Sequence, residues 1–127
     1  MACLFKVAPV PVTEGSVIVA AKPYRRALPE PGERIFLWWT EDADGRGLSG
    51  FGECIAVATP PGLVQATVRV GALDPTGVGF GKAQLAPLRD TESDAPEATL
   101  SKKLFRQAHN KVIALTSEEE AFLDTHF

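Results

Sequence analysis

Short runs of alternating apolar and polar residues fill the first two-thirds of the chain and predict strands rather than long helices. The clearest run covers residues 33–40. Leu37 and Trp39 project to one side of this strand and Trp38 to the other. Because both faces carry large side chains, we expect this strand to be central, with Trp39 buried in the main core.

Two further runs predict a β-hairpin. Residues 48–58 contain Gly50 and Gly52, which favour a bulge or a tight bend. Residues 63–73 alternate regularly, and a Pro-Pro-Gly turn ending at Gly62 separates the two runs. The positions expected to face inward in the second run are Val64, Ala66, Val68 and Val70.

Three shorter segments complete the predicted strands. Residues 4–12 are apolar but contain Pro9 and Pro11, so they predict an edge strand or an extended lead-in. Residues 16–21 favour a strand over a helical turn, and residues 111–115 predict the last strand.

Helical signals are confined to the end of the chain, because ten prolines and eleven glycines break up most of the rest. Residues 90–99 predict a loop and residues 100–108 a short helix. A final helix is expected from Thr116 or Ser117 to Phe127, with Ser117 and Glu120 spaced as a capping box.

This order of elements predicts a mainly β (α+β) fold in which short strands follow one another as a meander. A small sheet must protect its edges, and a closed or nearly closed barrel is the usual solution. The length of 127 residues fits a single domain covering 1–127. The final helix is expected to cap the barrel.

Charge and composition narrow the function. The net charge is −3 and the pI about 5.4, which argues against binding nucleic acid mainly by neutralising phosphates. A local basic cluster nevertheless lies near the end of the chain, at Lys102, Lys103, Arg106 and Lys111.

No apolar run approaches the roughly 20 residues of a membrane helix, and the first residues do not form a signal peptide. Cys3 and Cys54 lack metal-ligand spacing, so we expect two buried thiols in a reducing cytoplasm and no membrane partner.

Three segments look like known catalytic or ligand-binding motifs but do not match them. The glycines of residues 77–81 lack the sixth-position glycine of a nucleotide loop, which is Lys82 here. Residues 47–50 are not a nucleophile elbow, and the acidic turn at residues 41–44 lacks the terminal glutamate of a Ca²⁺ loop. We therefore expect no enzyme activity, no cofactor and no metal.

Four segments of the chain match a known domain pattern, namely residues 31–39 (PGERIFLWW), 47–54 (GLSGFGEC), 104–107 (LFRQ) and 112–119 (VIALTSEE). In these segments the chain resembles the EVE branch of the PUA-like superfamily. It implies a PUA-like pseudobarrel of five to six strands with short flanking helices. It also implies a pocket for a nucleobase, often a modified one, or for a related small planar ligand.

Two constellations are candidates for such a pocket. Trp38 could stack on a base, and packing under a flanking helix is an equally good interpretation. Arg106 offers a planar fork for phosphate or base edges, although its segment also fits a solvated helix face. The candidate ligand-binding residues are Trp38, Trp39, Thr40, Arg46, Leu48, Arg106, Gln107, His109 and Lys111.

The expected function is non-catalytic recognition of nucleic acid or of a modified base, with Trp38 and Arg106 bordering one pocket. The alternative is a small-molecule or protein-binding module without nucleic-acid contact. The acidic balance favours the alternative, whereas the aromatic residues, the basic cluster and the resemblance favour the first.

Overall fold

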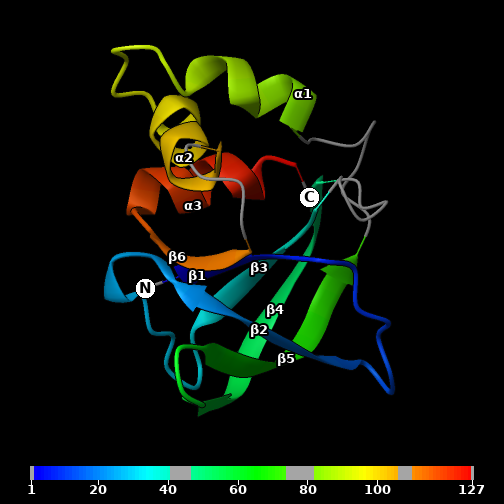
Figure 1. Cartoon of the computed structure of the whole chain (residues 1–127). Helices are drawn as coiled ribbons and strands as arrows, with labels where there is room; N and C mark the ends of the chain where they lie inside the picture. The colour runs from blue at the N-terminus through cyan, green and yellow to red at the C-terminus, as the bar shows by residue number, and fades with distance from the viewer. Residues whose placement is uncertain (1, 41–46, 74–81, 106–109, 127) are drawn as a thin grey trace.

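Six strands close into a barrel in the computed structural model, which describes residues 2–40, 47–73, 82–105 and 110–126 (Figure 1). The strands are β1 (Ala2–Val7), β2 (Ser16–Pro23), β3 (Arg34–Trp39), β4 (Gly47–Ala58), β5 (Val64–Leu73) and β6 (Lys111–Leu115). The prediction of a small, mainly β fold that closes its edges is confirmed.

The strand order around the barrel is β1-β3-β4-β5-β2-β6, with β6 returning to β1. The pairs β1/β3 and β2/β6 are parallel, and the other four pairs are antiparallel. The predicted meander is therefore correct only for β3-β4-β5. Strand β1, near the start of the sequence, pairs with β6, near its end.

Strand β1 is not the edge strand that its prolines predicted. It pairs with β3 on one side and with β6 on the other. The strand ends at Val7, before Pro9 and Pro11, so neither missing N–H falls within the hydrogen-bonded ladder.

Strands β3, β4 and β5 form where the alternating pattern predicted them, and the turn at Gly62 joins β4 to β5. The register shifts between Phe51 and Gly52, and again between Cys54 and Ala56. A Cβ atom on Gly52 would collide with the carbonyl oxygen of Arg69 on β5. A glycine at this position lets the two strands approach each other closely.

The barrel interior is a closed apolar core. The predicted inward face of β5 is confirmed, with Val64, Ala66 and Val68 buried and Val70 packed against them. Both thiols lie in the same core, as expected. Its buried members are Cys3, Phe5, Val7, Val17, Val19, Ala21, Ala27, Ile35, Leu37, Cys54, Val64, Ala66, Val68 and Val112.

A second apolar core lies between the barrel and a layer of helices that covers one side of it (Figure 1). The outward faces of β1, β3 and β6 supply its floor. The helical segments are η1 (Tyr24–Arg26), α1 (Lys82–Leu85), η3 (Ala86–Leu88), α2 (Pro96–Phe105) and α3 (Ser117–Asp124).

Helix α2 begins at Pro96, so the prediction of a loop through residue 99 is wrong there. A proline fits the first helical position, where its missing N–H has no intrahelical partner in any case. Helix α3 ends at Asp124 rather than at the chain end.

The predicted capping box of α3 is displaced by one residue. Thr116 Oγ1 accepts from Glu119 N at 3.1 Å, and Glu119 Oε1 accepts from Thr116 N at 2.9 Å. The Ser117–Glu120 pairing is therefore wrong. Glu119 is fully buried and also binds groups of α2, which selects it over the half-buried Glu120.

Candidate functional site

A row of five side chains crosses the helix-covered face of the barrel. The ladder registers place Lys22 beside Lys111, Lys111 beside Lys6, Lys6 beside Trp38 and Trp38 beside Leu48. Partners in register share a face of the sheet, so three cations and an aromatic residue lie side by side. The row contains three of the residues predicted to bind a ligand.

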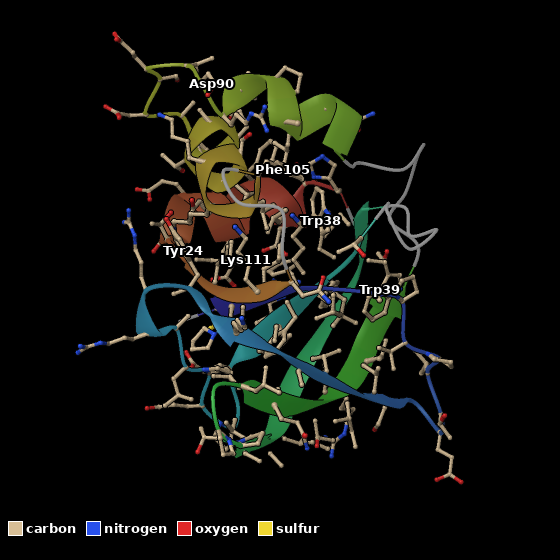
Figure 2. The ribbon with its side chains drawn as sticks, in the orientation of Figure 1. Tyr24, Trp38, Trp39, Asp90, Phe105 and Lys111 are labelled. Carbon is tan, nitrogen blue, oxygen red and sulfur yellow. The ribbon has the colours of Figure 1, made fainter. Side chains whose placement is uncertain are left out.

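Trp38 is buried at 1% exposure and meets the Phe105 ring of α2 edge-on, with 5.8 Å between ring centroids (Figure 2). Of its two interpretations, packing under a flanking helix is the one that the structure has. A stacking surface on this ring would require α2 to move.

Trp39 occupies the opposite face of β3 and is only half-buried against the barrel core, so the prediction that it is fully buried is wrong. It is the last residue of β3, at the rim of the barrel. Thr40 follows and donates from its N–H to the Val7 carbonyl at 2.8 Å. Leu48 is buried beside Trp38.

Lys6 lies within the row and is held by α2. Its Nζ donates to the Leu104 carbonyl at 2.8 Å and lies 4.9 Å from the centroid of the Phe105 ring. An ammonium group at the end of a helix is favourable, because the last carbonyls carry the negative end of the helix dipole. Lys6 therefore secures α2 on the barrel.

Lys111 is more enclosed than Lys6, at 1% exposure. Its Nζ lies 5.3 Å from the centroid of the Tyr24 ring of η1 (Figure 2). No hydrogen bond or ion pair links this ammonium to any residue that the structure describes. Burial lowers the pKa of Lys111, because the charged form loses its hydration.

A cleft of about 560 Å³ lies between η1 and the helices α2 and α3, and we name it the Tyr24 cleft. The half-buried Tyr24 ring lines it, with the Arg25 guanidinium 5.2 Å from the ring centroid. Its lining residues are Tyr24, Arg25, Asp94, Pro96, Thr99, Lys102, Lys103, Thr116, Glu118 and Glu119.

The backbone of η1 is unusual. Arg25 and Arg26 both adopt left-handed conformations, with φ of 52° and 61°. Such conformations are rare outside glycine and concentrate at functional sites. In η1 two successive residues have this conformation, and both arginine side chains are exposed directly after Tyr24.

The sequence interpretation did not include Tyr24 and Arg25. The available signal was an aromatic residue followed by two arginines, directly after a strand. Nothing in that pattern predicts the left-handed turn.

A second, shallower groove of about 430 Å³ lies near β3, β4 and β5, and we name it the Phe51 groove. The Arg34 guanidinium stands 4.1 Å from the centroid of the Phe51 ring and forms an ion pair with Asp124 of α3 at 2.6 Å. Its lining residues are Gly32, Glu33, Arg34, Phe51, Gly52, Glu53, Arg69, Val70 and Gly71.

Four of the predicted ligand-binding residues lie outside the described residues. They are Arg46, Arg106, Gln107 and His109. The predicted pocket between Trp38 and Arg106 thus remains a prediction.

Within the described ranges, no three His, Cys, Asp or Glu side chains group closely enough to hold a metal ion. Burial raises the pKa of the Cys3 thiol to about 11, so this thiol is not activated as a nucleophile. No helix in the described part of the chain is long and apolar enough to span a membrane.

The protein was compared with protein-family models, curated proteins and solved structures, and none of the three comparisons found a match.

Proposed function

We propose that this domain is a PUA-like, non-catalytic binding module of the cytoplasm that recognises nucleic acid or a modified nucleobase. A closed six-stranded barrel with flanking helices is compatible with the pseudobarrel that the resemblance implies. The two free, buried thiols suit a reducing compartment.

The observation that carries the proposal is the Tyr24 ring. It is half-buried in a cleft, and cationic groups of Arg25 and Lys111 lie close to it. Stacking of a base on an aromatic side chain contributes about 1–3 kcal/mol per base. The exposed Lys22, which lies two residues before η1, and the exposed Arg26, which is the last residue of η1, can attract the phosphates of the same nucleic-acid strand.

The opposite wall of the cleft suits base recognition in a different way. Asp94 and Glu118 are exposed there, and carboxylates accept hydrogen bonds from the amino groups of bases. With a net charge of −3, the protein should bind plain duplex weakly and show a shallow dependence on salt. A single strand or a displaced base is the ligand that this chemistry fits.

Fluorescence anisotropy with labelled oligonucleotides tests the proposal. Short single- and double-stranded oligonucleotides, with and without modified bases, are titrated with wild type, Tyr24→Leu and Arg25→Gln. Both variants should weaken binding. Arg69→Gln is the matched control, because Arg69 is exposed and lines the other groove. If wild type binds none of the oligonucleotides at tens of micromolar, the proposal fails.

The alternative, a small-molecule or protein-binding module, is favoured by one observation. The Phe51 groove has an aromatic and aliphatic floor at Phe51 and Val70, with a guanidinium beside it. A small planar molecule could stack there without any phosphate contact. If wild type binds no oligonucleotide but binds a small planar molecule, and Arg69→Gln weakens that binding, the alternative holds and the site lies in this groove.

A further inference from the structure

Two of three enclosed lysines on the helix-covered side show how a buried ammonium is normally satisfied by a hydrogen-bond acceptor. Lys6 donates to the Leu104 carbonyl, and Lys103 Nζ lies 2.7 Å from Glu119 Oε1. Lys111 is the most buried of the three. Within the described residues its ammonium has the Tyr24 ring beside it and no acceptor.

An unsatisfied ammonium is an unusual feature of a protein interior. It carries three donors, and removing its charge from water is costly unless a partner compensates. A ring face at 5.3 Å gives a weaker compensation than a hydrogen-bonded anion. A buried ammonium with a ring face beside it and no acceptor is an arrangement typical of a residue that binds an anion.

The ammonium is not sealed off. Among the described residues, no side-chain nitrogen or oxygen is both fully enclosed and without a hydrogen-bond partner. Since Lys111 Nζ has no such partner, this atom is not completely enclosed, although the residue as a whole is only 1% exposed. Lys111 does not itself line the Tyr24 cleft, but its neighbour Tyr24 does, so a ligand held against that ring would bring its charged group towards Lys111.

The surrounding charges favour an anion over a neutral acceptor. Lys22 and Lys6 flank Lys111 in register on the two neighbouring strands. Arg25 approaches the same Tyr24 ring. The acidic residues Asp94 and Glu118 are exposed, where water and salt screen them.

We propose that Lys111 is an oxyanion-binding residue that holds the phosphate of a nucleotide seated against Tyr24. This inference rests on the function proposed above and adds to it the group that is recognised and the residue that recognises it. Lys111 acts as the buried charge, and Tyr24 provides the surface for the base.

Isothermal titration calorimetry with three kinds of probe tests this inference. The probes are the four ribonucleosides, their 5′-monophosphates and inorganic phosphate. Wild type should bind at least one monophosphate about tenfold more tightly than its nucleoside. Lys111→Met and Lys111→Gln should both lose that preference. Arg69→Gln removes an exposed positive charge that lies outside the Tyr24 cleft, and this variant should keep the preference.

The outcomes separate this inference from the function beneath it. Equal affinity for nucleoside and monophosphate would overturn the role of Lys111 and leave nucleobase recognition standing. A phosphate preference that survives in both Lys111 variants would also overturn it. Tight binding of inorganic phosphate alone, dependent on Lys111, would support the oxyanion site and refute nucleic-acid recognition. If no nucleoside, monophosphate or oligonucleotide binds, both proposals fail.

Discussion

Substitution of Glu119 is the most direct test of how the helix layer is held together. It is fully buried at the start of α3 and accepts from three groups. The donors are Lys103 Nζ at 2.7 Å, Thr99 Oγ1 at 2.8 Å and Thr116 N at 2.9 Å. One side chain thus closes the N-terminus of α3 and ties that helix to α2.

Two substitutions separate charge from hydrogen bonding. In Glu119→Gln the amide oxygen can still accept from Lys103 and Thr116, so we expect a loss of about 1–2 kcal/mol from the removed charge assistance. Glu119→Ala removes all of these acceptor atoms and takes the ion pair from the Lys103 ammonium, whose side chain is 22% exposed and which then keeps, among the described residues, only its hydrogen bond to the Ala114 carbonyl at 3.1 Å. That change should lower the free energy of unfolding by about 3–5 kcal/mol.

Urea unfolding followed by tryptophan fluorescence measures both values. Glu118→Gln is the control, because Glu118 is exposed in the same first turn and should change stability by less than about 0.5 kcal/mol. Combining Glu119→Ala with Lys103→Met should cost less than the sum of the single changes, since each single change leaves one charged group without its ion-pair partner. Strict additivity, or a Glu119→Ala loss no larger than that of Glu118→Gln, would refute the reasoning.

The remaining predictions concern the barrel core, the buried Lys111 and the close contact between β4 and β5 at Gly52. The free energy of unfolding in each case is measured by urea or thermal unfolding. Val68→Ala should cost about 1–3 kcal/mol, since the side chain is fully buried in the barrel; a loss below about 0.5 kcal/mol would contradict this. Lys111→Met should stabilise the apo protein by about 1 kcal/mol or more, because a buried ammonium without an acceptor is removed. That gain should narrow as pH rises towards 10.5, because the lowered pKa of Lys111 makes the folded protein release this proton before the unfolded chain does. Burial raises the pKa of the Cys3 thiol from 9.0 to about 11, so stability should fall by at most about 3 kcal/mol as the pH rises across that window, and Cys3→Ala should not show the fall. Gly52→Ala should cost more than about 2 kcal/mol and clearly more than Gly71→Ala, because the new methyl group meets backbone at Gly52 but the edge of a ring at Gly71; equal losses would disprove the close-approach argument.

Local pattern was sufficient where neighbouring residues decide the structure. The alternation of residues 63–73 predicted β5 and its inward face, because a period of two is a property of the strand itself. The opposite orientations of Trp38 and Trp39 followed from the same rule. The pattern did not show which of the two faces a helix would cover, because that depends on α2, some sixty residues later in the chain.

The errors share a cause in contacts between distant segments. Ser117–Glu120 and Thr116–Glu119 have the same spacing, and the choice between them rests on Lys103 and Thr99 across the helix layer. The position of β1 depends on pairing with β6, which no local window includes.

The Tyr24 cleft is a third case. It depends on two consecutive left-handed arginines, a conformation that the residue types Arg25 and Arg26 disfavour. The predicted site residues that the structure describes lie on strands or directly after one, whereas Tyr24 and Arg25, which the sequence interpretation did not include, lie on η1.

The place of β1 between β3 and β6 has a consequence for how the protein is made. Strand β1 is synthesised well before β6 and needs β6 before its second edge can pair, so the barrel cannot close until β6 has been made. Contacts that join segments so far apart in sequence form slowly, because a long loop must close first. Until then the nascent chain carries an apolar strand with one open edge, which is prone to wrong pairing with other chains. Emergence of β6 from the ribosome, rather than formation of any local hairpin, should therefore be the event that commits this domain to its fold.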